Sequence, residues 1–248
     1  MLTYIILGAL QGLFEWLPIS SEGVVGIASR FLIKDFQPLE IALFSHLGTF
    51  LAALIYFRRD WFNLLTFKDK PLFRFLLISV PVSGLIGFLL YGAVKNMVLG
   101  SGLLILTGFG LLLTAYCHKN KKILNLNFNL LAVLTGIVQG LAVIPGLSRS
   151  GSTIFVLSWG KFDPEKVLKI SYMMSAPVVL GMAVFLFWQN PVLLISAWPV
   201  LIVSFLVGIL TLSFLFKLAA KIDFFKFALL FAVLCFLGAG LEFFIQAF

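Results

Sequence analysis

The sequence predicts an all-α integral membrane protein, an inverted repeat with about six transmembrane helices and two re-entrant helix–loop–helix hairpins. Composition is the first observation behind this prediction. Of the 248 residues, 61% are hydrophobic and only 11% are charged, whereas a soluble domain carries about 25% charged residues. The second observation is a set of long stretches without any charge, such as 99–117, 192–216 and 227–241. The third is a pair of interrupted apolar stretches, one in each half of the chain.

Uninterrupted apolar segments predict the transmembrane helices, because a helix needs about 20 apolar residues to cross a bilayer. The first half of the chain contains three such segments, at about 39–57, 73–92 and 100–117. The second half contains three more, at about 167–188, 193–215 and 226–246. We therefore expect six spans, three in each half.

The interrupted stretches, about 3–33 and 129–160, each precede one of these trios. Proline, glycine, serine and charged residues break both of them, so neither makes a clean span. Broken helices at membrane depth are tolerated only where they are buried in protein or line a wet cavity. We therefore expect both stretches to be re-entrant hairpins.

Matching motifs indicate an internal duplication within a single membrane domain. The run Gln-Gly-Leu at 11–13, followed by Pro18, recurs at 139–141, followed by Pro145. With three spans in each copy, the second copy enters the bilayer from the opposite side, which makes an inverted repeat. The expected boundaries are about 1–120 for the first repeat and about 125–248 for the second, within one domain over 1–248.

The basic residues predict the orientation. The 18 Lys and Arg residues lie mainly between the apolar segments, and the inverted layout places most of them on one side of the bilayer. Positively charged loops stay cytoplasmic, so we expect a multi-pass protein of the cell membrane with both termini outside. The net charge of +8 is thereby explained without a nucleic-acid partner. The two cysteines, Cys117 and Cys235, have no metal-like spacing.

Glu15 is the first candidate for chemistry. A carboxylate in an apolar helix costs roughly 2.5–3.5 kcal/mol on insertion scales, so it needs a partner or a wet cavity. Gln11 lies four residues earlier, on the same helix face. One interpretation is a structural ion pair, with Arg149 as the partner. The other is a carboxylate that faces a functional site, as a proton acceptor or a cation ligand.

Serines follow the break in each interrupted stretch. Ser20 and Ser21 come after Pro18, and serine is a favoured N-cap residue. A purely structural interpretation is that they cap the next helix. The functional interpretation is compatible with it, because the N-terminus of a helix is also where an anion is best received.

The run from Pro145 to Thr153, Pro-Gly-Leu-Ser-Arg-Ser-Gly-Ser-Thr, is the stronger signal. Its glycines let the backbone approach a ligand closely, its hydroxyls supply donors, and Arg149 can grip a phosphate with two N–H groups. The alternative is a tight turn whose arginine reaches for the membrane interface. His46, in the first uninterrupted segment beside Ser45, is a candidate for a supporting role at the same site.

At these residues the sequence resembles the undecaprenyl-diphosphate phosphatase family of the bacitracin-resistance type. The first family motif, close to (Glu/Gln)-Gly-Leu-x-Glu-(Phe/Trp)-Leu-Pro-x-Ser-Ser-x-Gly-His, stands here at residues 11–24. The second, close to Pro-Gly-x-Ser-Arg-Ser-Gly-x-Thr, stands unbroken at 145–153. The likeness continues through Ser-His-Leu-Gly-Thr at 45–49 and Arg58-Arg59, and covers nearly the whole chain.

The resemblance implies an enzyme that removes the terminal phosphate of a polyprenyl diphosphate and so recycles the lipid carrier of envelope-polymer synthesis. It implies a site that opens toward the outer face and a divalent cation, Mg²⁺ or Ca²⁺, with the protein ligands of that metal unknown. Glu15 matches the essential glutamate, Ser21 the nucleophile or phosphate contact, and Arg149 the phosphate-binding arginine. Substrate contacts are expected from Gln11, Ser20, Gly146, Ser148, Ser150, Gly151 and Thr153. The oligomeric state stays open, with a homodimer as one option.

Position 24 departs from the pattern. Val24 stands where the motif has histidine, and Glu22 replaces a small residue beside it. We associate this Ser-Ser-Glu-Gly variant with archaeal members of the family. The missing imidazole either puts the usual catalytic route in doubt or moves the base to Glu15, Glu22 or His46.

A phosphatase mechanism is therefore the leading hypothesis. Arg149 and the N–H groups around 148–151 would hold the phosphates, and Glu15 would accept a proton from Ser21 or from water. The alternative is a transporter or flippase that binds a phosphorylated lipid without cleaving it, because inverted repeats with broken helices are typical of secondary transporters.

Overall fold

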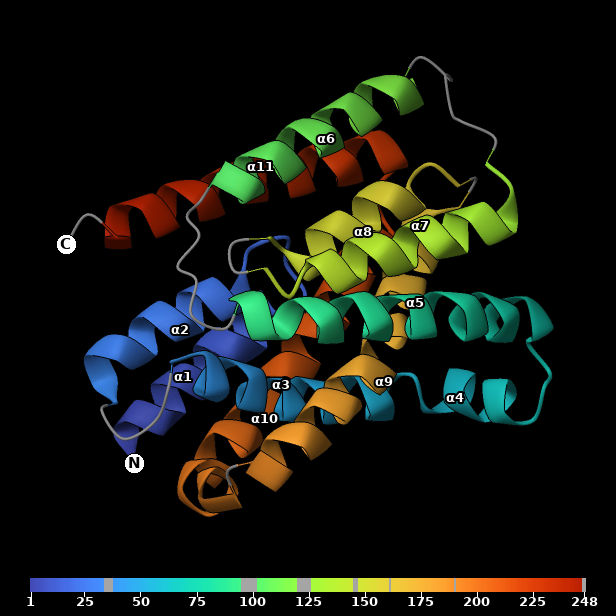
Figure 1. The fold of residues 1–248 in the computed structure, drawn as a ribbon. Coiled ribbons are helices and arrows are strands. Elements are labelled where there is room, and N and C mark those ends of the chain that lie inside the picture. Colours follow the sequence, from blue (N-terminus) through green and yellow to red (C-terminus); the bar gives the residue numbers. More distant parts are fainter. Residues whose placement is uncertain are drawn as a thin grey trace.

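The computed structural model describes residues 1–33, 38–94, 102–119, 126–144, 147–160, 162–189 and 191–246. The residues described form α-helices and no strand (Figure 1). The helices are α1 (Leu2–Phe14), α2 (Ser21–Leu32), α3 (Pro38–Tyr56), α4 (Arg58–Leu65), α5 (Lys70–Val94), α6 (Gly102–Lys119), α7 (Phe128–Leu141), α8 (Arg149–Leu157), α9 (Pro164–Gln189), α10 (Pro191–Ala219) and α11 (Phe224–Gln246).

Five of these helices are long and apolar enough to cross a membrane, namely α5, α6, α9, α10 and α11. A sixth span results if α3 and α4 count together, with a bend of 75° between them. These elements cover the six segments expected from the sequence, and the chain is a multi-pass membrane protein. Within α5, α9 and α10, the internal prolines Pro81, Pro177 and Pro199 each remove one backbone donor from the helix.

Two shorter apolar helices, α1 and α7, have 13 and 14 residues. At 1.5 Å per residue each is about 20 Å long, which is well below the ~30 Å of a bilayer core. Each is followed by a second short helix, α2 after α1 and α8 after α7, and the described residues between the two helices are not helical. The two interrupted stretches of the sequence therefore form two helix–loop–helix units.

The first helix of each half packs along a helix of the other half. α1 lies against α10, and α7 lies against α5, while α6 and α11 lie side by side at one edge of the molecule (Figure 1). Glycines permit these contacts: a Cβ on Gly12 would lie 2.7 Å from Gly208 N, and one on Gly136 would lie 2.6 Å from Ser79 O. Small residues at such interfaces let helix backbones approach closely in membranes.

Trp16 and Tyr172 fix the loop after α1. The Trp16 indole N–H donates to Gly208 O at 2.8 Å, and the Tyr172 hydroxyl donates to Trp16 O at 2.6 Å. Their rings meet edge to face with centroids 5.0 Å apart, and both side chains are almost fully buried. Because the indole N–H and the phenol are both hydrogen-bonded, α9 and α10 hold this loop in a defined position.

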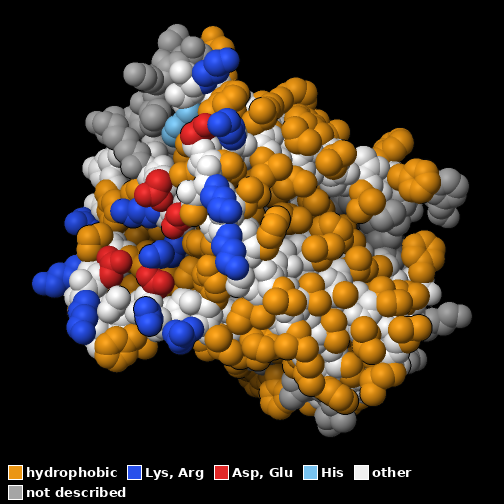
Figure 2. Space-filling view, turned by 180° about the vertical axis from the view of Figure 1, so that it is seen from behind, with side chains coloured by type: hydrophobic (Ala, Val, Ile, Leu, Met, Phe, Trp, Pro, Cys, Tyr) orange, Lys and Arg blue, Asp and Glu red, His pale blue; other side chains and the backbone are white. Residues whose placement is uncertain are grey.

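Figure 2 shows charged side chains gathered toward one end of the molecule, whereas hydrophobic side chains cover most of the remaining face. The exposed apolar residues include Phe88, Leu210 and Phe214, as expected of a surface that faces lipid. An ion pair joins Lys169 of α9 to Asp60 of α4 at 2.8 Å.

Candidate active site

Glu15 follows the last residue of α1 and is 5% exposed. Gln11 lies one turn earlier on the same helix face, and its side-chain amide donates to Glu15 Oε2 at 2.6 Å. The i, i+4 spacing that the sequence indicated therefore brings the two side chains together. An amide donor on this oxygen stabilises the ionised carboxylate.

The start of α2 adds hydroxyl groups. Ser20 is the N-cap, and its Oγ accepts a hydrogen bond from Gly23 N at 3.1 Å, so the capping interpretation is confirmed for this serine. Ser21, the next residue, instead donates to Glu15 Oε2 at 3.1 Å. Thus only the second serine of the pair has its hydroxyl directed at the carboxylate.

The second helix–loop–helix unit is built in a parallel way. Ser148 is the N-cap of α8, and its Oγ accepts from Gly151 N at 3.2 Å. Arg149 is the first residue of this helix. Thr153 donates to Arg149 O at 2.9 Å and contacts Ser171 of α9. The Thr153 hydroxyl therefore links the first turn of α8 to α9.

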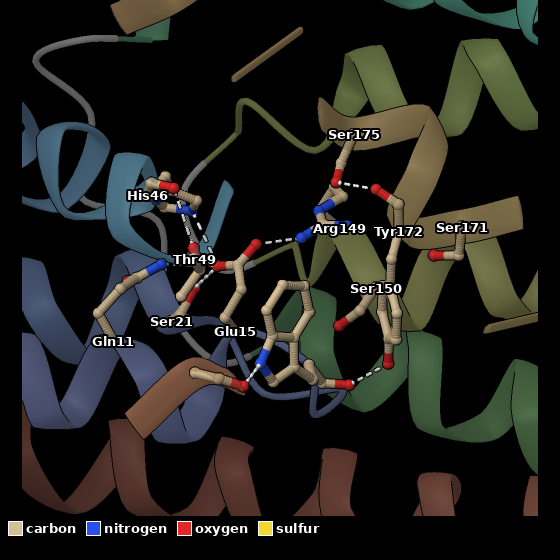
Figure 3. A network of polar contacts seen from close by, with 12 residues as sticks. Gln11, Glu15, Ser21, His46, Thr49, Arg149, Ser150, Ser171, Tyr172 and Ser175 are labelled. Atoms are coloured by element: carbon tan, nitrogen blue, oxygen red, sulfur yellow. Dashed lines mark hydrogen bonds and ion pairs between the residues drawn. The ribbon is translucent and has the colours of Figure 1, made fainter. Parts of the chain in front are cut away.

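The loop after α1 meets the start of α8 directly. Ser150 donates to Leu17 O at 2.7 Å, and a Cβ on Gly151 would lie 3.2 Å from Pro18 Cβ. Across this contact, Arg149 Nη2 donates to Glu15 Oε1 (Figure 3). Residues 134 positions apart in the chain thus form one largely buried ion pair between the two units.

Arg149 retains free hydrogen-bonding capacity. Its Nη1 is buried and has no hydrogen-bond partner within the described parts of the chain. Its guanidinium carbon lies 6.0 Å from the centre of the Tyr172 ring, within the range of a cation–π contact. Because a buried donor without a partner is costly, an anion that bonded Nη1 would be strongly favoured at this point.

His46 reaches the same carboxylate from α3. Its Nε2 lies 3.2 Å from Glu15 Oε2 and 3.9 Å from Glu22 Oε1, and its side chain is largely buried. Figure 3 shows His46, Gln11, Ser21 and Arg149 converging on Glu15 from separate helices. Glu15 therefore receives contacts on both of its carboxylate oxygens.

Two cavities meet at these residues. The smaller, of about 20 Å³, lies between the two loops and is lined by Glu15, Ser21, Ser148 and Arg149, among others. The larger, of about 550 Å³, runs between α5 and α9. Glu22, His46 and Arg149 line both cavities, so the polar cluster lies where the two cavities join.

The larger cavity, which we call the α5–α9 groove, is mostly apolar. Its walls include Phe88 and Tyr91 of α5 and Met182 and Phe185 of α9. Glycines also line it: a Cβ on Gly84 or Gly181 would meet nothing within 4 Å. An apolar groove with a cluster of polar groups at one place is typical of a small-molecule or lipid site.

The described residues do not fit a cation site made by the protein alone. Over the ranges given above, no group of three or more His, Cys, Asp or Glu side chains is placed to hold a metal ion. Both oxygens of Glu15 are already occupied by an arginine, an amide, a hydroxyl and an imidazole. A divalent cation generally needs six or more oxygen ligands, and these residues cannot provide them.

The structure thus brings most of the predicted site residues together. Gln11, Ser21 and Arg149 each contact Glu15, and Ser20, Ser148, Ser150, Gly151 and Thr153 build the starts of α2 and α8 around them. Gly146 lies outside the described residues. Sequence reasoning did not single out Tyr172, although a buried phenol in an apolar span is a signal of the same kind as Glu15.

The ion pair between Glu15 and Arg149 is the structural alternative considered from the sequence, and the contact is present. A buried ion pair is weak evidence for stabilisation, because desolvation offsets most of the attraction. A purely structural pair also gives no reason for the unpartnered Nη1 or for the adjoining cavities. These features favour a site that receives an anion.

Comparison with known proteins agrees with this arrangement. The profile of the family described as bacitracin resistance protein BacA matches residues 4–237. An undecaprenyl-diphosphatase from Methanococcoides burtonii is 34% identical over 91% of this chain and 93% of its own length. Proteins of the same name from Treponema denticola and Syntrophotalea carbinolica are 33% and 32% identical, over 91% and 98% of this chain and 92% and 98% of their own lengths.

Proposed function

The chain belongs to the bacitracin resistance protein BacA family, and we propose that it hydrolyses undecaprenyl diphosphate, or a similar polyprenyl diphosphate, to the monophosphate and phosphate. The reaction returns a lipid carrier to envelope-polymer synthesis. The relatives named above carry the name of this activity and align with at least nine-tenths of the chain. The chain is accordingly assigned as a membrane hydrolase acting on a phosphoric anhydride.

The position of Arg149 is the observation that carries the proposal. One terminal guanidinium nitrogen, Nη2, is held by Glu15, and the other terminal nitrogen, Nη1, is buried without a partner in the described chain. The same side chain lines both the small polar cavity and the apolar groove. A charged headgroup on a long apolar tail is the ligand whose two parts match these two cavities.

The headgroup would lie at the polar junction. There Arg149 Nη1 can donate to a phosphate oxygen while Nη2 stays on Glu15, so the ion pair positions the arginine before substrate arrives. Donors that are fixed in advance in a buried site are the main means of stabilising charge on a transferring phosphoryl group. The N-terminus of α8, capped by Ser148, adds a favourable dipole.

The nucleophile is either Ser21 or a water held near it. Ser21 Oγ already donates to Glu15 Oε2 at 3.1 Å, which is the geometry expected of a nucleophile and its base. A water in the same place would lose its proton to the same carboxylate. The bond that breaks joins the terminal phosphorus to the bridging oxygen, which leaves on the polyprenyl phosphate.

The tail would lie in the α5–α9 groove. This groove begins at Arg149, His46 and Glu22 and continues between apolar side chains of two proline-containing helices. In lipid, an isoprenoid chain gains little from burial alone, since lipid tails are equally apolar. The groove would therefore act mainly by aligning the first isoprene units, so that the diphosphate is presented to Arg149.

We propose that a divalent cation, Mg²⁺ or Ca²⁺, accompanies the diphosphate. Glu15 and Glu22 both line the small cavity, and Arg149 is the only Lys or Arg side chain lining it in the described chain. Adding a diphosphate therefore leaves an excess of negative charge, which a counter-ion would reduce. A chelator should lower the rate of phosphate release, whereas adding the cation should leave the melting temperature of the lipid-free protein unchanged.

We also propose that the two helix–loop–helix units are re-entrant hairpins of an inverted repeat. The exchange of packing, α1 against α10 and α7 against α5, supports this arrangement. The gathering of charged side chains toward one end of the molecule supports a cytoplasmic end there and termini on the outer side of the cell membrane. Impermeant labelling of a cysteine placed at position 2 in intact cells tests the orientation.

Phosphate release by the purified protein tests the function. The wild type should release phosphate from undecaprenyl diphosphate, and Glu15→Gln and Arg149→Ala should each lose at least ~100-fold. Arg59→Ala, at an exposed arginine of α4, is the matched control and should keep the wild-type rate. Wild-type rates in both site variants would contradict the proposal. A lipid-induced rise in melting temperature without phosphate release would instead indicate a transporter or flippase.

A further inference from the structure

Both ring nitrogens of His46 have a defined partner. Nδ1 lies 2.7 Å from Ala42 O, one turn earlier in α3, and Nε2 lies 3.2 Å from Glu15 Oε2. The residue is 8% exposed. Two contacts from one buried ring fix its orientation, so the side chain is held against Glu15 rather than free to turn away.

These partners determine where the protons lie. A carbonyl oxygen only accepts, so Nδ1 must carry a hydrogen. Nε2 then faces carboxylate oxygens, which also only accept when they are ionised. The contact with Glu15 is a hydrogen bond only if a proton lies between the two groups, on the ring or on the carboxyl. If the 3.2 Å contact is such a hydrogen bond, His46 and Glu15 share one proton.

Glu15 has three further donors around it, and His46 faces a second carboxylate. Arg149 donates to the other oxygen of Glu15, and Ser21 and Gln11 donate to the oxygen that His46 contacts. Glu22 from α2 is the second carboxylate facing the ring, with its Oε1 3.9 Å from Nε2. His46 also lines both cavities, so its Nε2 is accessible to a ligand at their junction.

Position 24 offers no imidazole. Val24 is buried, and it lies three residues after Ser21, hence on the same face of α2 as the hydroxyl that contacts Glu15. A histidine at position 24 would therefore project from the same face of α2 as Ser21. In this chain the imidazole near Glu15 is that of His46, which comes from α3.

We propose that His46 is the proton donor of the reaction and takes the place of the histidine that the motif carries at position 24. As the P–O bond to the bridging oxygen breaks, its electron pair stays on that oxygen, and the proton shared by His46 and Glu15 is transferred to it. As the new P–O bond forms, Glu15 takes the proton of the nucleophile. The pair holds one proton before and after the step. This inference rests on the proposed phosphatase function.

Substitutions at the two positions test the proposal. His46→Gln keeps a hydrogen-bond donor beside Glu15 but removes the transferable proton, so kcat should fall ~100-fold or more while KM changes little. Adding Val24→His to that variant should raise kcat at least about tenfold above the kcat of His46→Gln alone. His118→Gln changes the other histidine of the chain and should have no effect. A wild-type kcat in His46→Gln overturns the proposal. If the double variant folds but its kcat is no higher than that of His46→Gln, His46 does not take the place of a histidine at position 24.

A second measurement needs no substrate and separates this inference from the phosphatase assignment. The chain has only two histidines, so ring-¹⁵N labelling gives two sets of signals, which His118→Gln assigns. In the wild type at neutral pH, the Nε2 signal of His46 should show a bound or shared proton. In Glu15→Gln it should move to the value of an unprotonated nitrogen. An Nε2 signal that does not change between the two proteins would refute proton sharing, whatever the phosphatase assay shows.

Discussion

Two helix interfaces of this protein, α3 against α10 and α5 against α9, have opposite character. At the first, Gly48 packs against the backbone of α10: a Cβ there would overlap Ser204 Oγ and lie 2.8 Å from Phe205 N. At the second, Gly84 faces open space, and the α5–α9 groove of about 550 Å³ lies between parts of the two helices. At the first interface glycine allows the two helices to pack closely, and at the second it borders the open groove.

Two glutamines show a second contrast between the carboxylate cluster and the groove. Gln11 and Gln139 occupy matching motif positions, but their partners differ. Gln11 donates to Glu15, whereas Gln139 donates to Ser83 Oγ and Met174 O beside the groove. One glutamine therefore belongs to the carboxylate cluster, and the other links α7 to the helices that form the groove walls.

The same glycine-to-alanine change at the two interfaces should have opposite effects, and this is the largest difference we expect. At Gly48 the methyl group meets backbone atoms that cannot turn aside, so Gly48→Ala should lower the free energy of unfolding by about 3 kcal/mol or more. At Gly84 nothing lies within 4 Å, and alanine should stabilise the helix by up to ~1 kcal/mol. Thermal unfolding of both variants in the same detergent measures the two changes in stability. Equal changes would contradict the difference in packing between the two interfaces.

Filling the groove should separate long from short substrates. Gly84→Trp places a large ring where the tail is proposed to lie, so kcat/KM for a long polyprenyl diphosphate should fall by about tenfold or more. For a diphosphate with one or two isoprene units, the change should be much smaller. The measurement is the ratio of kcat/KM values for the two lengths. A ratio unchanged from wild type would place the tail elsewhere.

The two glutamines should differ in their effect on turnover. Gln11→Leu removes a donor from the reacting carboxylate and should lower kcat by about tenfold or more, in line with about 1.5–3 kcal/mol for a hydrogen bond to a charged group. Gln139→Leu should lower kcat by less than about threefold, because its partners are not in the carboxylate cluster. Steady-state kinetics of both variants decide the point, and a larger loss at Gln139 would contradict our division of roles.

The smallest effects should come from the two matched N-caps. Ser20 and Ser148 each accept a backbone N–H three residues on, at 3.1 Å and 3.2 Å. Replacing either by alanine should cost about 1 kcal/mol of stability. Equal losses in melting temperature would show that the caps are structurally equivalent, whereas a loss several times larger at one site would show an additional role for that serine.

The membrane spans and the two broken stretches could be predicted because hydropathy and helix-breaking residues act locally. Gln11 and Glu15 could be paired from helical spacing alone. The contact between His46 and Glu15 could not, because it depends on how α3 is placed beside α1. The groove could not be predicted either. Gly48 and Gly84 look alike in the sequence, and only the spacing of the helices around them distinguishes the two positions.

Photo-crosslinking tests the central claim most directly: the headgroup lies at Arg149 and the tail leaves through the α5–α9 groove. The probe is a polyprenyl diphosphate with a photoreactive group on its first isoprene units. We expect labelled peptides from α5 and α9, with the label lost when unlabelled undecaprenyl diphosphate competes and reduced in Arg149→Ala. Label spread over the exposed faces of α6, α10 and α11, and insensitive to the competitor, would contradict the account.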